Sequence, residues 1–301
     1  MQAALAGGVG LGVMGRPGRA HAQQAAPAQP AVLKLCSQEG RLPGKNLQEK
    51  VENVLKFGGC GIEFGGLNMA RAKEIKTALA GTGCGVAALC WGSCSGDLVA
   101  TDAARRQKGI DALKQVLQAA AEAGSTGVIF VPTFHKQSEL PPDEITRILV
   151  DILPAIGAYA VQVGSRVLLE PLNKGETFYL NRLEQGADIC RKANSPGICM
   201  MGDFYHMGKE ETDDEAAFVT AGPHLHHVHL ASRTRVLPGQ DKLKDPNGAE
   251  RNFVSGFRGL KRIGYQDYCS LECGLADKTD PMVEIPKAFA LLKQQWEEAK
   301  L

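Results

Sequence analysis

Four residues with metal-binding side chains occupy equivalent places in four successive segments of the second half of the chain. They are Glu170 in VLLEPLN, Asp203 in MMGDFYHM, His229 in HHVHLAS and Glu272 in CSLECG. Each lies at or near the end of a short apolar run, the pattern of a buried β-strand. Three carboxylates and one imidazole suit Mn²⁺, Mg²⁺ or Co²⁺ better than a metal that prefers thiolates. The pattern therefore predicts one divalent metal ion, with Mn²⁺ favoured, held by these four side chains.

The alternation of side chains along a strand directs these groups to one side. If Glu170 points inward, Leu168 does too, and Met201 shares the face of Asp203 in the same way. No lysine or arginine stands at the same level of these strand ends. We therefore expect carboxylates that repel one another unless their pKa values rise or a cation binds. The alternative is four unrelated polar residues that end their strands.

Short apolar runs alternate with longer amphipathic segments from residue 31 onward, which predicts one domain over 31–301. The expected strands cover 31–37, 61–66, 85–91, 127–133, 166–172, 197–204, 224–231 and 267–272. The expected helices cover 46–58, 69–81, 102–125, 141–164, 181–195, 210–222, 252–264 and 280–300. Eight such units of about 34 residues match a (β/α)8 TIM barrel, in which reacting groups lie at the carboxyl ends of the strands. An open doubly wound sheet is less favoured because no GxGxxG follows the first strand.

The composition excludes several classes of protein. Of 301 residues, 44% are hydrophobic, and 34 basic side chains nearly balance 33 acidic ones. A formal net charge of +1 attracts neither nucleic acid nor a membrane surface, and no apolar run reaches the roughly 18 residues of a spanning helix. The nine cysteines form no CxxC pair and fall mostly in strand-like runs, which favours buried thiols over a disulfide framework.

The first thirty residues differ from the rest and have the features of an export signal followed by a spacer. Residues 3–14 are apolar and uncharged, Ala20-His21-Ala22 has an A-x-A cleavage pattern, and QQAAPAQPA follows. No lysine or arginine precedes the apolar stretch. We expect residues 1–22 to direct export, for a periplasmic location, and residues 1–30 to lie outside the folded domain. The alternative is a disordered N-terminus on a cytoplasmic protein.

The ordered run of LEPLNKGET, MGDFYHM, HVHLASRTR and SLECG resembles the xylose isomerase-like barrel superfamily of sugar isomerases, epimerases and endonuclease IV proteins. Within it, the chain is most similar to ketose 3-epimerases of the tagatose or psicose type. The resemblance implies that Glu170, Asp203, His229 and Glu272 bind one divalent metal, and that Glu170 and Glu272 transfer the proton. The additional histidines of endonuclease IV are missing from the first two strands, and no basic stripe is present. A nucleic-acid partner is therefore not expected.

The resemblance also implies a set of substrate contacts. It assigns sugar binding to Glu176, His206 and Arg235, and to Glu63 at the end of GIEFGG, for which a solvated carboxylate is the alternative. The chain departs from the ketose epimerases at Ser232, where they commonly carry an acidic residue, and in its long loop 233–254. These departures leave the particular sugar open.

The expected reaction begins with removal of a proton beside a ketone. A metal stabilises the resulting enediolate, one glutamate takes the proton and the other returns one. Return to the same carbon inverts it, whereas return to the carbonyl carbon exchanges aldose and ketose. An inosose-dehydratase-like lyase and a non-catalytic sugar-binding barrel are the alternatives, and a homo-oligomer is compatible with the sequence.

Overall fold

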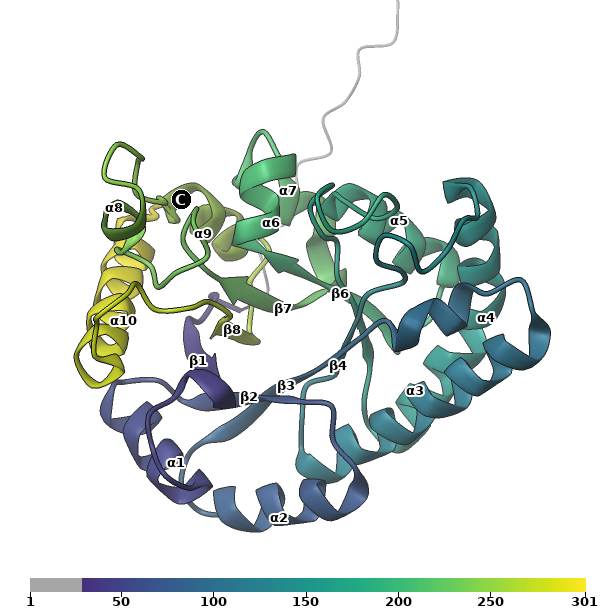
Figure 1. Cartoon of the computed structure of the whole chain (residues 1–301), viewed down its shortest axis with the longest axis horizontal. Coiled ribbons are helices and arrows are strands. Elements are labelled where there is room, and N and C mark those ends of the chain that lie inside the picture. Colours follow the sequence, from purple (N-terminus) through teal and green to yellow (C-terminus); the bar gives the residue numbers. More distant parts are fainter. Residues whose placement is uncertain (1–28) are drawn as a thin grey trace, which may run out of the picture.

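Residues 29–301 are described by a computed structural model, in which eight parallel strands close into a barrel. The strands are β1 (Lys34–Gln38), β2 (Gly61–Gly65), β3 (Gly85–Gly92), β4 (Val128–Phe130), β5 (Val167–Leu169), β6 (Ile198–Asp203), β7 (Leu225–Leu230) and β8 (Tyr268–Leu271). They pair in chain order, and the pairing of Cys36 with Ser270 closes the barrel. In Figure 1 the strands form the centre and helices surround them. The predicted (β/α)8 barrel is confirmed, with all eight predicted strands present.

The helices cover the outside of the barrel. They are α1 (Leu47–Lys56), α2 (Met69–Leu79), α3 (Ala103–Ala123), α4 (Pro142–Val163), α5 (Leu183–Ala193), α6 (Phe204–Glu210), α7 (Asp214–Ala221), α8 (Asp241–Lys244), α9 (Val254–Arg262) and α10 (Pro281–Glu298). Three 3-10 turns are η1 (Glu39–Arg41), η2 (Cys94–Val99) and η3 (Gly222–His224). Asn46, Asn68 and Asp102 accept backbone hydrogen bonds at the starts of α1, α2 and α3. Gly124 and Gly164 end α3 and α4 in the left-handed conformation that glycine adopts without strain.

A small apolar layer fills the barrel beneath the carboxyl ends of its strands. Its buried members are Ala88, Ile129, Leu168, Cys199 and Met201. They form a cluster separate from the larger core between strands and helices. Leu168 and Met201 therefore point inward as predicted, and Glu170 and Asp203, two residues further along their strands, point the same way.

The sequence pattern predicts neither α6 nor α8, and the predicted sixth strand runs one residue too far. β6 ends at Asp203, whose carboxylate accepts a hydrogen bond from the Tyr205 N–H at 2.8 Å and thereby begins α6. His206 therefore lies in the first turn of α6, which begins directly after the end of β6. Helices of four to seven residues are too short to show a clear apolar periodicity.

The predicted export signal and most of its spacer, residues 1–28, lie outside the described residues. Within residues 29–301, no helix combines the length and apolar character needed to cross a membrane. All nine cysteines fall in this part of the chain as free thiols, and six of them are buried. The expectation of core cysteines agrees with this placement.

Candidate metal centre

The four predicted metal ligands meet at the carboxyl ends of the strands. One ligand atom from each of Glu170, Asp203, His229 and Glu272 lies within 4.8 Å of all the others. The Nδ1 atom of His229 is 3.0 Å from a Glu272 oxygen and 3.6 Å from a Glu170 oxygen. The reading of these residues as unrelated strand caps is therefore wrong, because the barrel brings them to one point.

Burial and mutual repulsion perturb the three carboxylates differently. Burial raises the pKa of Glu170 to about 7, and that of Asp203 to about 6. Burial would also raise the pKa of Glu272, but nearby His229 and Arg235 lower it to about 2. Burial, with the neighbouring carboxylates, therefore opposes ionisation of Glu170 and Asp203, whereas Glu272 is kept ionised by His229 and Arg235.

Two buried atoms of the cluster have no hydrogen-bond partner among residues 29–301. They are Oδ2 of Asp203 and Nδ1 of His229, and both residues are fully buried. A buried polar atom without a partner costs roughly 1–3 kcal/mol, and a divalent cation between these atoms and the two glutamates would satisfy both. Three oxygen donors and one nitrogen donor match the hard divalent ions. The residues present therefore fit the predicted metal.

Arg235 corrects the expectation that no basic side chain shares this level. Its Nη2 lies 2.6 Å from an oxygen of Glu272, and its Nη1 lies 3.7 Å from Oδ2 of Asp203. The strand ends do lack basic residues, but the loop after β7 supplies this one. Arg235 has φ +59°, an uncommon left-handed conformation for a non-glycine residue, and backbone hydrogen bonds to Ser232 and Gly274 hold it there.

Asp241 organises the loop that carries Arg235. Its side chain is buried and accepts hydrogen bonds from the backbone N–H groups of Arg233, Thr234 and Arg251 at 2.8–3.1 Å. Burial would raise the pKa of Asp241, but these donors lower it. The carboxylate of Asp241 therefore connects the two ends of loop 233–254 through hydrogen bonds.

We expect Asp241→Asn to destabilise this loop by about 1–3 kcal/mol, because an amide accepts fewer hydrogen bonds than a carboxylate. Since the pKa of Asp241 is lowered by folding, its stabilisation is present above about pH 3.9 and is lost as the pH falls through the folded-state value. Thermal melting between pH 3 and 7, with hydrogen exchange of residues 232–253, measures both effects. The exposed Asp277→Asn variant is the control, and equal melting of the two variants would contradict the expectation.

The predicted substrate residue His206 is held in one tautomer. Its Nδ1 faces two donors of Asn173, the backbone N–H at 3.1 Å and the side-chain amide at 2.7 Å. Burial and the charge of Arg235 lower the pKa of His206 to about 3. The ring is therefore neutral with its proton on Nε2, which lies 3.1 Å from Nη1 of Arg235 and 3.3 Å from Oδ2 of Asp203.

Glu176 completes this side of the site. Its carboxylate accepts a hydrogen bond from the side-chain amide of Asn173 at 2.9 Å and lies 4.0 Å from Arg235. Three of the four predicted substrate residues, Glu176, His206 and Arg235, thus form one connected group beside the cluster. Asn173 links Glu176 and His206 through hydrogen bonds to both.

The fourth predicted substrate residue, Glu63, is placed differently. Its side chain is fully buried, so the alternative of a solvated strand-end carboxylate is wrong. It lies behind His229 and pairs with Nε2 of both His227 and His229 at 2.7 and 2.8 Å. Gln38 donates one hydrogen bond to Glu63 and another to Glu272.

Two residues of the site were not predicted from sequence. Asn173 stands three positions after Glu170 in the same motif, so its spacing offered a signal. Gln38 ends the first strand in LKLCSQ, which carries Lys34 and Cys36 but no carboxylate and no histidine. Its role follows from the pairing of β1 with both β2 and β8, which brings its amide within hydrogen-bond distance of Glu63 and Glu272.

A closed (β/α)8 barrel with a buried carboxylate–imidazole cluster at its strand ends defines a class of barrel that binds its ligands there. The family model described as "Xylose isomerase-like TIM barrel" matches residues 51–295. The chain belongs to this family.

The relatives of the chain are named sugar epimerases. It is 28% identical over 272 residues to 3-dehydro-D-guloside 4-epimerase of Escherichia coli, an alignment that covers 87% of this chain and 99% of that protein. It is 25% identical over 210 residues to L-ribulose 3-epimerase of Methylomonas, covering 69% of this chain and 70% of the relative. The predicted enzyme class, sugar epimerase or isomerase, is confirmed by these relatives.

Solved structures agree with this assignment. The apo structure of 3-keto-D-glucoside 4-epimerase from Escherichia coli superposes with a TM-score of 0.76 at 26% identity, covering 87% of this chain and all of that one. A structure of L-ribulose 3-epimerase also gives a TM-score of 0.76, at 23% identity over 89% of this chain and 96% of the other, and shares the fold.

Proposed function

We propose that this chain is a divalent-metal-dependent epimerase that inverts a hydroxyl-bearing carbon next to a ketone in a sugar. The four-residue cluster at the ends of β5 to β8 carries this proposal. The names of the relatives support it, because 3-epimerisation of a ketose and 4-epimerisation of a 3-dehydro-glycoside both act on a carbon beside a carbonyl. Mn²⁺ is the proposed ion, held by Glu170, Asp203, His229 and Glu272.

Glu170 and Glu272 are the proposed proton-transfer pair. They come from β5 and β8, with two strands between them, so their carboxylates approach the centre of the barrel from different sides. One removes the proton from the reacting carbon, and the other delivers a proton to the opposite face. A divalent ion held by the four residues would supply positive charge next to the oxygens that become more negative when this proton leaves.

His206 and Arg235 are the proposed oxygen-binding pair. The Nε2–H of His206 and the guanidinium of Arg235 are both donors, and they lie 3.1 Å apart at the edge of the cluster. Two donors this close to each other need a shared acceptor that lies within hydrogen-bond distance of both. A hydroxyl or carbonyl oxygen of the sugar satisfies both and fixes the substrate over the two glutamates.

We expect Arg235→Ala to raise the KM for the sugar about 10- to 100-fold, because a hydrogen bond to a charged group contributes about 1.5–3 kcal/mol. The effect on kcat is smaller, since Arg235 positions the substrate and does not exchange its proton. Steady-state kinetics on a keto-sugar measures the two constants. Arg233→Ala, an exposed arginine of the same loop, is the control. A loss of kcat with an unchanged KM would contradict the positioning role.

The function is tested by incubating purified protein with Mn²⁺ and candidate keto-sugars in D2O. Deuterium entering the carbon beside the ketone, together with formation of the epimer, is the expected result. Deuterium with an aldose product would indicate an isomerase, and an ultraviolet-absorbing product would indicate the lyase. Sugar binding without exchange would identify a non-catalytic binding protein.

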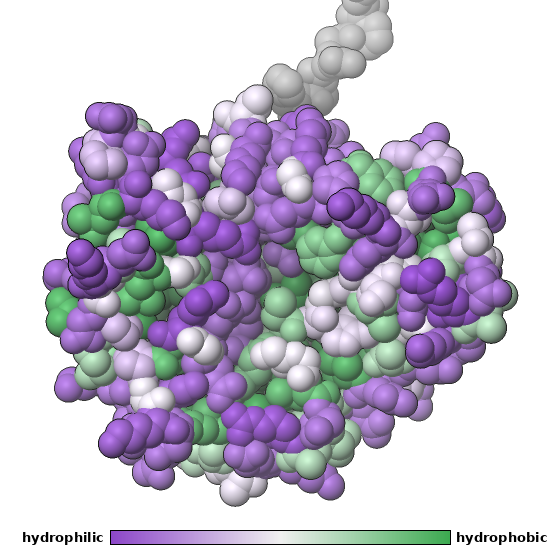
Figure 2. Space-filling view, in the orientation of Figure 1, coloured by the Kyte–Doolittle hydropathy of each residue, from purple (hydrophilic) through white to green (hydrophobic). Residues whose placement is uncertain are grey.

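A cavity beside the cluster favours a keto-sugar with a substituent over a free ketose. It has a volume of about 280 Å³ and is lined by Gln38, Glu39, Gly40, Glu63, Phe64, Gly65 and Cys90. Figure 2 shows this face of the molecule hollowed at its centre, where hydrophilic and hydrophobic residues meet. None of these lining residues is basic, so an uncharged group fits better than a phosphate. We propose that the group at the glycosidic position of a keto-glycoside occupies it.

Gly65 tests this substrate class. Gly65 lines the cavity, and a Cβ atom added there would meet no atom within 4 Å, so a larger residue can be introduced at this position without a clash at its Cβ. We expect Gly65→Leu to lower kcat/KM for a methyl or phenyl 3-keto-glucoside about 100-fold, and to leave a free ketose within about threefold. Ala78→Leu on the outside of α2 is the control. Equal loss for both kinds of sugar would assign the cavity to the reacting ring itself.

A further inference from the structure

Glu63 is a fully buried acidic residue beside the four-ligand cluster, to which it does not belong. It lies on the inward face of β2, and its residue is 1% exposed. Its Oε2 accepts hydrogen bonds from Nε2 of His229 at 2.8 Å and Nε2 of His227 at 2.7 Å. Its other oxygen accepts from the amide of Gln38 at 2.9 Å. Both carboxylate oxygens therefore have protein partners.

This placement determines which nitrogen of His229 faces the four-ligand cluster. Because Nε2 carries the proton that Glu63 accepts, Nδ1 is the atom directed at Glu170 and Glu272. Nδ1 has no hydrogen-bond partner in the described residues. A carboxylate behind a metal-binding histidine fixes the tautomer and the ring orientation, and raises the basicity of the nitrogen that binds the metal.

We infer that Glu63 is a positioning residue of the metal centre, whose carboxylate acts through His229 and binds neither the reacting oxygens of the sugar nor the metal. The inference rests on the proposed metal at the four-residue cluster. It replaces the substrate contact that the family resemblance implies for Glu63, because the side chain of Glu63 is fully buried behind the imidazole of His229 and its carboxylate already accepts three hydrogen bonds from protein donors.

A second metal ion is the main competing explanation. Glu63, His227 and His229 could themselves surround a cation, since one ligand atom from each lies within 4.8 Å of the others. The separations of 2.7 and 2.8 Å are those of charge-assisted hydrogen bonds, which explain the contacts without a further ion. The two explanations differ in the number of metal ions that each chain binds.

Isothermal titration of metal-free protein with Mn²⁺ distinguishes the explanations. For wild-type protein we expect one ion per chain, and for Glu63→Gln an affinity weaker by about 10- to 100-fold. The neutral amide oxygen is a weaker acceptor than the carboxylate for the two histidine N–H groups that share Oε2, and the amide NH2 would face the donor of Gln38. The KM for the sugar stays within about threefold when the variant is saturated with Mn²⁺. Two ions per chain would overturn the inference, and so would a raised KM with unchanged metal affinity.

His227→Gln is the matched variant, because it removes the other partner of the same carboxylate oxygen. We expect it to change Mn²⁺ affinity only a few-fold, since Glu63 still holds His229. An effect equal to that of Glu63→Gln would show that the whole buried group, and not Glu63 acting on His229, supports the site.

A measurement on wild-type protein covers the case in which Glu63→Gln does not fold. Nitrogen-15 NMR of the histidines, with Mg²⁺ bound, should show His229 protonated at Nε2 and unprotonated at Nδ1. The opposite tautomer would overturn the inference. Absence of any metal binding at the four-ligand cluster would instead refute the proposed function, so the two failures are distinguishable.

Discussion

Replacing either Glu170 or Glu272 with glutamine is expected to lower turnover at least about 10⁴-fold while the barrel stays folded. General acid–base catalysis alone contributes about 10²- to 10⁴-fold, and each residue also lies in the candidate metal cluster. Glutamine has nearly the same volume and can still offer one oxygen to a metal, but it cannot exchange a proton. The rate of epimer formation with saturating Mn²⁺, together with thermal melting, measures the expected change.

The two variants should also differ from each other. If each glutamate serves one face of the reacting carbon, Glu272→Gln slows deuterium exchange more strongly for one epimer, and Glu170→Gln more strongly for the other. Glu184→Gln, an exposed residue of α5, is the control and should keep full activity. Wild-type turnover in either glutamine variant would remove that residue from the mechanism. Equal slowing of both epimers in both variants would show that the glutamates act only by holding the metal.

The strand ends were predictable because a barrel imposes strong constraints on sequence. β4 and β5 read VIF and VLL and are fully buried, and the helices between strands have regular apolar spacing. Once eight such units are counted, the closed topology brings the last residues of β5 to β8 together. The alternation of inward and outward side chains then selects Glu170, Asp203 and His229 without any knowledge of contacts.

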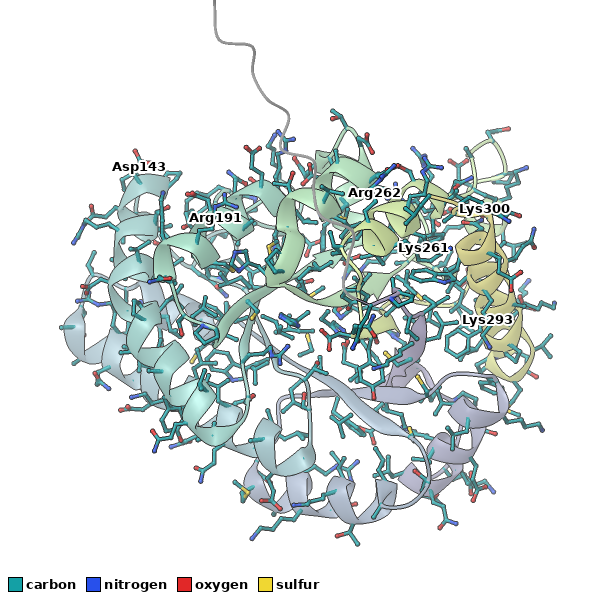
Figure 3. All side chains as sticks on the ribbon, turned by 180° about the vertical axis from the view of Figure 1, so that it is seen from behind. Asp143, Arg191, Lys261, Arg262, Lys293 and Lys300 are labelled. Carbon is teal, nitrogen blue, oxygen red and sulfur yellow. The ribbon has the colours of Figure 1, made fainter. Side chains whose placement is uncertain are left out.

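The charges around the cluster were not predictable in the same way. Arg235 belongs to a loop, and its position depends on a left-handed backbone angle and on the buried Asp241, neither of which has a periodic pattern. The helical position of His206 depends on the early end of β6 at Asp203. Arg191, Arg262 and Lys293, in contrast, are exposed on the outer helices α5, α9 and α10, as the view from behind shows (Figure 3). The spacing of residues in the sequence predicts which face of a strand or helix a side chain occupies. The position of a side chain on a loop can be determined only from the folded structure.

Glu63 shows the limit of a family resemblance. Its place at the end of β2 is where a sugar contact was expected, and the strand prediction there was correct. Which side of His229 it occupies depends on the tilt and register between β2 and the distant β7. The same motif is therefore compatible with a contact to substrate or with support behind a ligand, and only the three-dimensional arrangement separates them.

Substitution of His229 is expected to have the second large effect, a loss of metal binding of at least about 10³-fold in affinity. His229 provides the one nitrogen of the four-ligand cluster, and its buried Nδ1 has no hydrogen-bond partner in the part of the chain that the structure describes. In wild-type protein, Mn²⁺ at 100 times its Kd should stabilise the fold by about 2.7 kcal/mol. The His229→Gln variant should show no rise of Tm on addition of Mn²⁺, and no deuterium exchange into a keto-sugar.

His226→Gln is the matched control for this prediction. His226 lies on the same strand, three positions before His229, but its Nδ1 pairs with Asp267 at 2.6 Å outside the four-ligand cluster. Its substitution can destabilise the apo-protein, yet it should leave the rise of Tm with Mn²⁺ intact. Since the measured quantity is the metal-induced change and not the Tm itself, a general loss of stability cannot imitate the loss of a ligand. A full Mn²⁺ response in His229→Gln would place the metal elsewhere in the barrel.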